Sequence, residues 1–223
     1  MAKVINDKSG SQVESIQEYE IATGTVITEG EFVKLSSGKV IPVVAGETAA
    51  ILGVAKEAHS GSADALNARS NGLKVLVSDS TTAVYSVPVP TATATSGTTT
   101  TFVVSGLGSV FSDDDFNGGK LKIKSKATAS TNTDVVGTVY DITDFTGSSA
   151  TFTFATAGGA ITAGDIMEIY PPIGFQKGNF DAAFQKIVLT ASATMPVRSI
   201  GYNTDMGVVR LEAALHELGN KKA

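Results

Sequence analysis

The sequence predicts an all-β protein made of small, barrel-like decks, and two observations carry this prediction. Short runs of Val, Ile, Phe and Thr alternate with turn-forming Gly, Pro, Asn and Ser along most of the chain. Charged residues make up only 17% of the 223 residues, against about 25% in an ordinary soluble domain, which suits repeated close protein–protein packing. A well-marked stretch in the first half also has a weaker copy in the second half, which suggests a duplicated deck.

The well-marked stretch is Gly30–Ala58. We expect a strand over Glu31–Leu35, a tight hairpin turn and a return strand over Lys39–Val44. Pro42 cannot donate a ladder hydrogen bond, so it favours an edge position or a bulge. The apolar run Ile51–Ala55 predicts a strand that is covered on both faces.

The segments around this stretch complete a first deck, expected over residues 21–92. Residues 1–20 are polar and are expected to form an extended N-terminal arm. Pro88 and Pro90 end the deck, because proline prevents further ladder pairing. Three more strands are expected from their alternating apolar residues: Tyr19–Ile27, Leu73–Val77 and Ala83–Val89.

A second deck is expected over residues 93–172. Thr91–Thr101 is of low complexity and is interpreted as a flexible crossover that leads into a strand. Val135–Val139 repeats the pattern of Ile51–Ala55, with Gly third in each apolar run. The interval from Pro90 to Pro172 is nearly the same as that from Gly53 to Gly137, which supports a weak internal repeat. The strands expected in this deck are Thr100–Ser105, Lys120–Lys124, Val135–Val139, Ala150–Phe154 and Asp165–Tyr170.

Residues 173–223 form a C-terminal segment for which the sequence indicates no role. Phe175, Phe180 and Phe184 are expected to anchor it, and strands are expected at Lys186–Ala191 and Met195–Ile200. The last residues suggest a short helix with an apolar stripe and a glycine stop: Val208, Leu211, Leu215, Leu218 and Gly219. The alternative is a strand with these residues on one face: Val209, Leu211, Ala213 and Leu215.

The sequence nominates no catalytic, cofactor-binding or metal-binding residue, so a non-enzymatic protein is expected. The chain has no cysteine, which excludes disulfides, a thiolate nucleophile and cysteine-ligated zinc. His59 and His216 are interpreted as solvated loop and tail histidines. Asp113–Asp115 is interpreted as a solvated turn or a helix cap, with a calcium site as the alternative. Neither a nucleophile elbow nor a phosphate-binding loop is present.

The charge pattern argues against nucleic acid as a partner, and the distribution of apolar residues argues against a membrane. The formal net charge is −5 and no run of Lys or Arg is present, so nucleic-acid binding is not expected. Lys120, Lys122, Lys124 and Lys126 alternate along a strand, so they form either a solvated face or a contact to an acidic partner. No segment approaches the about 20 apolar residues of a membrane span, and the first residues lack an apolar signal core. We therefore expect assembly in a cytoplasm.

Gly30–Val40 and Ile51–Ala55 resemble the β domain of tailed-bacteriophage capsid decoration proteins, also called cement or head-stabilising proteins. That family shows G-x-x-V-x-L/V-x-x-G-x-V, a spacer and then [I/L/V]-[L/V]-G-[V/T]-A. The resemblance covers Ile21–Pro90, and more faintly Gly118–Pro172. It implies a β-barrel or β-tulip protein, often a homotrimer, that binds the outer face of an icosahedral shell. It also implies a terminal arm that helps to lock neighbouring major capsid proteins together, and no active site.

The function that we expect is therefore that of a structural virion protein on the capsid surface, assembled in the host cytoplasm. Its expected partner is the major capsid protein, with no cofactor, nucleic acid or membrane. One alternative is a tail-tube or fibre-associated virion protein. Another is a carbohydrate-binding surface module, although a chain with no Trp and only five Tyr offers little for an aromatic platform. A hydrolase on a β scaffold would need one of the two histidines.

Overall fold

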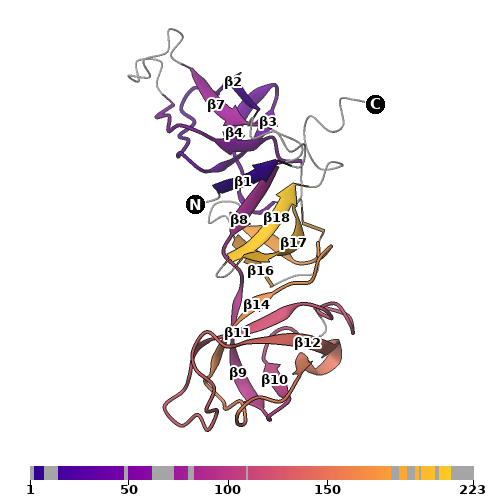
Figure 1. Cartoon of the computed structure of the whole chain (residues 1–223). Coiled ribbons are helices and arrows are strands. Elements are labelled where there is room, and N and C mark those ends of the chain that lie inside the picture. Colours follow the sequence, from indigo (N-terminus) through magenta and orange to yellow (C-terminus); the bar gives the residue numbers. More distant parts are fainter. Residues whose placement is uncertain are drawn as a thin grey trace.

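The computed structural model describes residues 3–7, 15–47, 50–61, 73–79, 83–108, 110–181, 186–189, 194–195, 197–203 and 206–211. These residues form eighteen β-strands and one 3-10 turn at Gly147–Ser149, with no α-helix among them. The all-β prediction is confirmed. The strands stack in three tiers along one long axis, with the barrel at the lower end of Figure 1.

The upper tier is a five-stranded sheet in the order β2-β7-β6-β3-β4. Its two edges meet at a single bridge between Ile21 and Val40, so the sheet curls almost into a barrel. Pro42 lies in edge strand β4, as its missing N–H predicts. The strands are β2 (Ile16–Glu20), β3 (Phe32–Ser36), β4 (Lys39–Pro42), β6 (Gly53–Ala55) and β7 (Lys74–Ser78).

The middle tier joins the beginning and the end of the chain. One sheet has the order β1-β8-β18-β17, and a smaller one has the order β16-β15-β5. Strand β8 therefore lies between an N-terminal strand and a C-terminal strand. The strands are β1 (Lys3–Asp7), β5 (Ala45–Glu47), β8 (Ala83–Val87), β15 (Asn179–Asp181), β16 (Lys186–Val188), β17 (Val197–Asn203) and β18 (Met206–Leu211).

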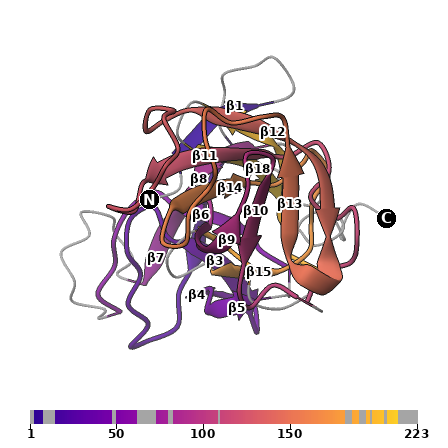
Figure 2. The ribbon, with the colours of Figure 1, turned by 90° about the horizontal axis from the view of Figure 1, so that it is seen from below.

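The lower tier is a closed barrel in the order β10-β13-β12-β11-β14-β9, seen end-on in Figure 2. Phe116 fills it, with its ring centroid 4.8 Å from that of Phe145 and 5.2 Å from that of Phe152. The closed barrel confirms the predicted architecture. Its strands are β9 (Thr91–Gly97), β10 (Thr101–Val104), β11 (Lys120–Ser125), β12 (Val139–Thr146), β13 (Thr151–Phe154) and β14 (Ile166–Tyr170).

The barrel is an insertion in the rest of the molecule. The chain enters it just after Pro90 and leaves it just before Pro171. These two points are adjacent, because the Ile169 N–H donates to the Pro90 carbonyl at 2.9 Å. We call the upper and middle tiers together the base, and the double connection the neck. The base is thus built from two separate parts of the chain, residues 3–90 and 171–211.

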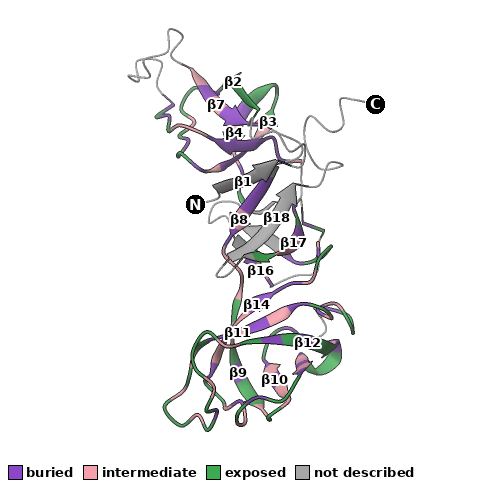
Figure 3. Ribbon diagram, in the orientation of Figure 1, coloured by how far each residue is buried: buried purple, intermediate pink, exposed green. Residues whose placement is uncertain are grey.

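The protein has two apolar cores, and β3 contributes to both. Phe32 joins the large core that continues into the barrel, with its ring 5.2 Å from that of Tyr85. Val33, its neighbour, joins the small core of the upper tier. Successive side chains of a strand point to opposite faces, so one strand serves two cores. Figure 3 shows the buried residues running along the axis.

The predicted strand over Ile51–Ala55 is covered on both faces, as expected. All five residues are buried, and Gly53–Ala55 form β6. A Cβ at Gly53 would lie 1.9 Å from the Ser78 carbonyl oxygen of β7. Glycine is therefore required here because the two strands approach closely.

The proposed copy of this strand in the second deck is wrong. Residues 135–138 form a turn, and β12 begins only at Val139. Val135 is 73% exposed, whereas Ile51 is fully buried. Gly137 has a φ of 97°, which suits a turn and not a strand. Gly53 allows two strands to approach closely, whereas Gly137 allows the backbone of a turn.

Two further expectations are corrected by strand pairing. Most of Thr91–Thr101, interpreted as a flexible crossover, is strand β9, which pairs with β14 over Thr91–Thr93 and with β10 over Ala94–Gly97. The expected C-terminal helix is wrong over 208–211, because Met206–Leu211 form β18 and pair with both β17 and β8. The strand alternative holds there. The rest of that helix, with Leu215, Leu218 and Gly219, and also Phe184 lie outside the described residues.

The described part of the N-terminal arm is extended and is bound to its own chain. Strand β1 pairs with β8, and β2 pairs with β7. The arm is thus part of both tiers of the base.

Candidate binding surface

The acidic run Asp113–Asp115 is a turn whose carboxylates have separate partners. The Gly147 N–H donates to Asp113 Oδ1 at 2.7 Å, and the Ser112 N–H donates to Asp115 Oδ2 at 2.8 Å. Lys177 forms an ion pair with Asp115. The three carboxylates do not converge, and no group of three or more His, Cys, Asp or Glu that could hold a metal ion exists among the described residues.

His59 is not the solvated loop histidine that the sequence suggested. Its residue is 2% exposed, and its Nδ1 accepts a hydrogen bond from the Gly61 N–H at 2.9 Å. Its main chain exchanges two hydrogen bonds of 2.8 Å with Ile27. His59 therefore fastens the loop before β3 to the loop after β6. No local pattern predicts this burial, because the covering residues come from elsewhere in the chain. His216 lies outside the described residues.

The lysines of β11 lie on one face, as predicted. Leu121 and Ile123 point into the barrel core, and the lysines that alternate with them face outward. Lys120 forms an ion pair with Asp141, and Lys122 lies 3.9 Å from Glu168 across the β11–β14 ladder. Positive and negative side chains therefore alternate on this side of the barrel, which leaves little net charge to attract an acidic partner.

The opposite side of the barrel is uncharged. Strands β9, β10 and β13 carry threonines at alternate positions there: Thr91, Thr93, Thr95, Thr101, Thr151 and Thr153. Cross-strand neighbours such as Thr101 and Thr153 pair directly. The barrel thus has one charged and one uncharged half.

Buried or partly buried carboxylates order the loops at the distal end of the barrel, the end away from the neck. Asp165 is 1% exposed and accepts hydrogen bonds from the Ala127 N–H, the Thr162 N–H and the Ser130 hydroxyl. Asp134 accepts from the Gly158 N–H at 2.7 Å and from the Tyr140 hydroxyl at 2.6 Å. These loops display Val135 and Val136 to solvent.

Hydrogen bonds to Asp134 shift the acidity of two groups. The Gly158 N–H, and then the Tyr140 hydroxyl, lower the pKa of the Asp134 carboxyl below its ordinary value. Burial, and then the hydrogen bond to Asp134, raise the pKa of Tyr140 to about 12. Ionised Asp134 is therefore the form that holds these loops together.

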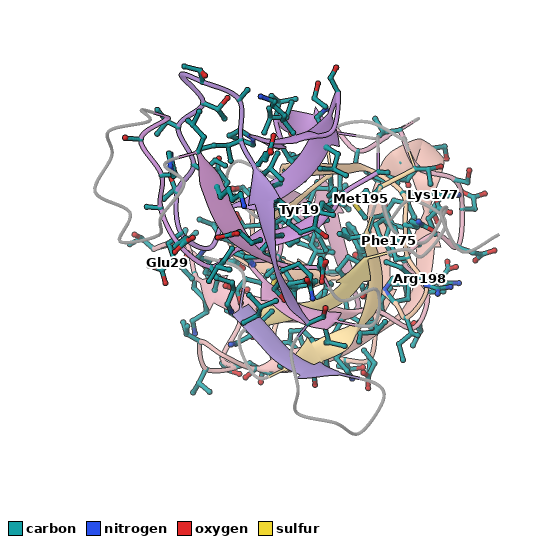
Figure 4. All side chains as sticks on the ribbon, turned by 90° about the horizontal axis from the view of Figure 1, so that it is seen from above. Tyr19, Glu29, Phe175, Lys177, Met195 and Arg198 are labelled. Carbon is teal, nitrogen blue, oxygen red and sulfur yellow. The ribbon has the colours of Figure 1, made fainter. Side chains whose placement is uncertain are left out.

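A plug from the base closes the neck end of the barrel. Phe175 lies 5.1 Å from Phe116 between ring centroids. Its main chain is held by β17, since the Ser199 N–H donates to the Phe175 carbonyl at 2.9 Å. Phe175 and Met195 are both buried, and Figure 4, viewed along the axis, shows them on the same side of the molecule as Arg198 and opposite Glu29. Base and barrel thus share one core.

Two hollows lined by described residues, and a few exposed apolar side chains, are candidate contacts. The larger hollow, about 600 Å³, lies at the neck between β9, β10 and β16. The smaller, about 240 Å³, is lined by Tyr170, Lys120 and Tyr202, and the lysine Nζ lies 5.4 Å from the Tyr202 ring centroid. Val26 and Val44 are 64% and 62% exposed on the base. None of these was indicated by the sequence.

No protein family, curated protein or solved structure matches this chain. The resemblance of Gly30–Val40 and Ile51–Ala55 to capsid decoration proteins therefore rests on those residues alone. No helix of the described residues is long and apolar enough to cross a membrane.

Proposed function

We propose that this protein is a structural virion protein that binds the outer surface of a tailed-phage capsid and stabilises contacts between major capsid proteins. The residues that carry the resemblance most clearly, Gly30–Val40 and Ile51–Ala55, belong to the base, whereas the fainter part, Gly118–Pro172, lies mostly in the barrel. The barrel is an addition inserted at the neck. The observation that carries the proposal is this division into a base with the family pattern and a projecting barrel.

The proposed orientation follows from the same division. The base faces the shell, and the barrel points away from it with its distal loops exposed. Each copy needs only modest affinity, because many identical contacts on one shell, and three per homotrimer, combine into strong overall binding. The exposed valines of the base are the side chains that we assign to the shell contact.

A binding experiment on expanded, undecorated capsids tests the proposal. Purified protein should add regular density to the outer surface in electron micrographs. Density confined to the tail, or rods and rings of the protein alone, would instead favour a tail-tube or fibre-associated role. An absence of binding to the capsids would refute the proposed decoration role.

Two matched double variants test the orientation. Val26→Asp with Val44→Asp places two charges on exposed base positions, and Val135→Asp with Val136→Asp does the same on the barrel. The base variant should bind capsids about tenfold more weakly or worse, because each charge must lose water at a contact, whereas the barrel variant should bind normally. The reverse result would place the barrel on the shell and contradict the orientation.

A further inference from the structure

The barrel has a seam, by which we mean the part of β9 that pairs with β14 on one side but has no β10 residue paired on the other. Along β9, the even-numbered residues face β14. The Ala94 N–H donates to the Asp165 carbonyl at 2.7 Å, and the Ile169 N–H donates to the Pro90 carbonyl. Main-chain groups of a strand alternate in direction, so the N–H groups of Thr91 and Thr93 face away from β14.

Strand β10 does not cover that side of β9. It pairs with β9 only from Ala94 to Gly97, and the chain then turns away at Gly106, which has a φ of 84°. The N–H groups of Thr91 and Thr93 therefore lie beyond the end of the β9–β10 ladder. They form a short stretch of sheet edge inside an otherwise closed barrel.

The base supplies the other side of the seam but does not close it. The Ile187 N–H of β16 donates to the Pro88 carbonyl at 3.3 Å. Neither Pro88 nor Pro90 has an N–H to return, so a ladder between β16 and the neck cannot continue. The two prolines that end the deck thus keep the seam open.

Between these edges lies the hollow of about 600 Å³. Its described lining contains no charged side chain. Val104, Leu107, Ile169 and Leu189 form apolar walls, and all four are at most 7% exposed. Thr91 and Thr93 are exposed at its rim. The site therefore offers main-chain donors at every second residue beside an uncharged surface of both polar and apolar atoms.

We propose that this neck hollow is the docking site for one extended, uncharged polypeptide segment of a partner protein, which adds a strand beside Thr91–Thr93. An extended peptide is the ligand whose own main-chain groups match donors at this spacing. Small apolar side chains suit the walls, and a charged side chain would lose its water without a partner. The edge spans only about 7 Å, so a few residues of the partner take part. This inference does not depend on the proposed function.

A displayed library of random linear peptides is the probe. Selection on the full-length protein should enrich peptides that carry small apolar residues at alternate positions. Thr93→Pro removes the N–H that faces the seam and leaves the β14 ladder in place, so it should weaken the selected peptides about tenfold or more. Thr93→Val is the matched control, since it keeps the N–H and the strand and should bind as the parent does.

A second measurement tests the proposal even if Thr93→Pro fails to fold. In the unmodified protein, the amide hydrogens of Thr91 and Thr93 should exchange rapidly with solvent, and a selected peptide should slow both. Slow exchange before peptide is added would show that the edge is already covered and would overturn the proposal. So would a library without enriched peptides, or equal binding of peptides to Thr93→Pro and Thr93→Val.

Discussion

Asp134 shows how one side chain can order a whole set of loops. Its carboxylate joins the loop before β12 to Gly158 in the loop before β14 and to Tyr140 at the start of β12. Its pKa is lowered by the Gly158 N–H and then by Tyr140, so the folded form favours the ionised carboxylate. A group with a lowered pKa stabilises the fold above its ordinary pKa and loses this effect as the pH falls through its folded value.

We expect Asp134→Asn to remove, at neutral pH, the stabilisation that the ionised carboxylate provides. The melting temperature of the variant should lie below that of the parent at pH 7, and the difference should shrink as the pH falls below the ordinary carboxyl pKa of 3.8. Thermal melts between neutral and acidic pH measure it. The pKa of Tyr140, read from phenolate absorbance, should also fall from about 12, with Tyr140→Phe identifying its signal. A constant difference at all pH values would contradict the role of the charge.

At the scale of elements, the N-terminal strand is the clearest case in which pairing changes an interpretation. The sequence describes 1–20 as an arm, and its polar residues fit a segment that waits for a partner. In the structure β1 pairs with β8, for example Val4 with Tyr85. The arm therefore already has a strand partner within the chain, and it covers one edge of β8.

Deletion of residues 1–9 should consequently destabilise the base itself. Loss of the short β1–β8 ladder should cost about 2 kcal/mol net, which corresponds to a melting temperature about 4–8 °C lower for a chain of this size. Amides of β8 should exchange faster, while those of the barrel strand β12 serve as the internal control. An unchanged melting temperature would show that the pairing contributes nothing to stability.

At the scale of the whole molecule, the insertion of the barrel predicts that it can be separated. Its two ends are adjacent at the neck, since Thr91 pairs with Glu168, and a closed barrel has no open sheet outside the seam. The shared core opposes this independence, because Phe175 from the base packs against Phe116 in the barrel. The closure of the barrel and the packing of Phe175 therefore contribute separately to the stability of the barrel.

We expect the fragment 90–171 to fold alone, with a lower melting temperature than the barrel has in the full chain. In the full chain, Phe175→Ala should cost about 3 kcal/mol, because it leaves a cavity against Phe116. Ile173→Ala, in the same segment but 79% exposed, is the matched control and should have little effect. Circular dichroism and thermal melts measure both. A fragment without β structure would show that the barrel depends on the base to fold.

The sequence by itself determined the class of the fold and the local chemistry of its strands. Alternation predicted which side of β11 is lysine and which is core, proline predicted the edge strand β4, and an apolar run predicted the doubly covered Ile51–Ala55. These features depend on residues close together in the chain. Periodicity and proline geometry act over a few residues, so a single sequence reports them.

Tertiary structure alone decided which strands pair, including the pairing of β1 and β18 with β8. His59 is buried by a distant loop, Val135 is exposed although it repeats the pattern of a core residue, and Val208–Leu211 belong to β18 beside β8. The open seam at Thr91 and Thr93 arises only where β10 leaves β9 and the neck prolines meet β16. Each of these outcomes depends on partners far away in sequence, whose positions local propensity does not contain.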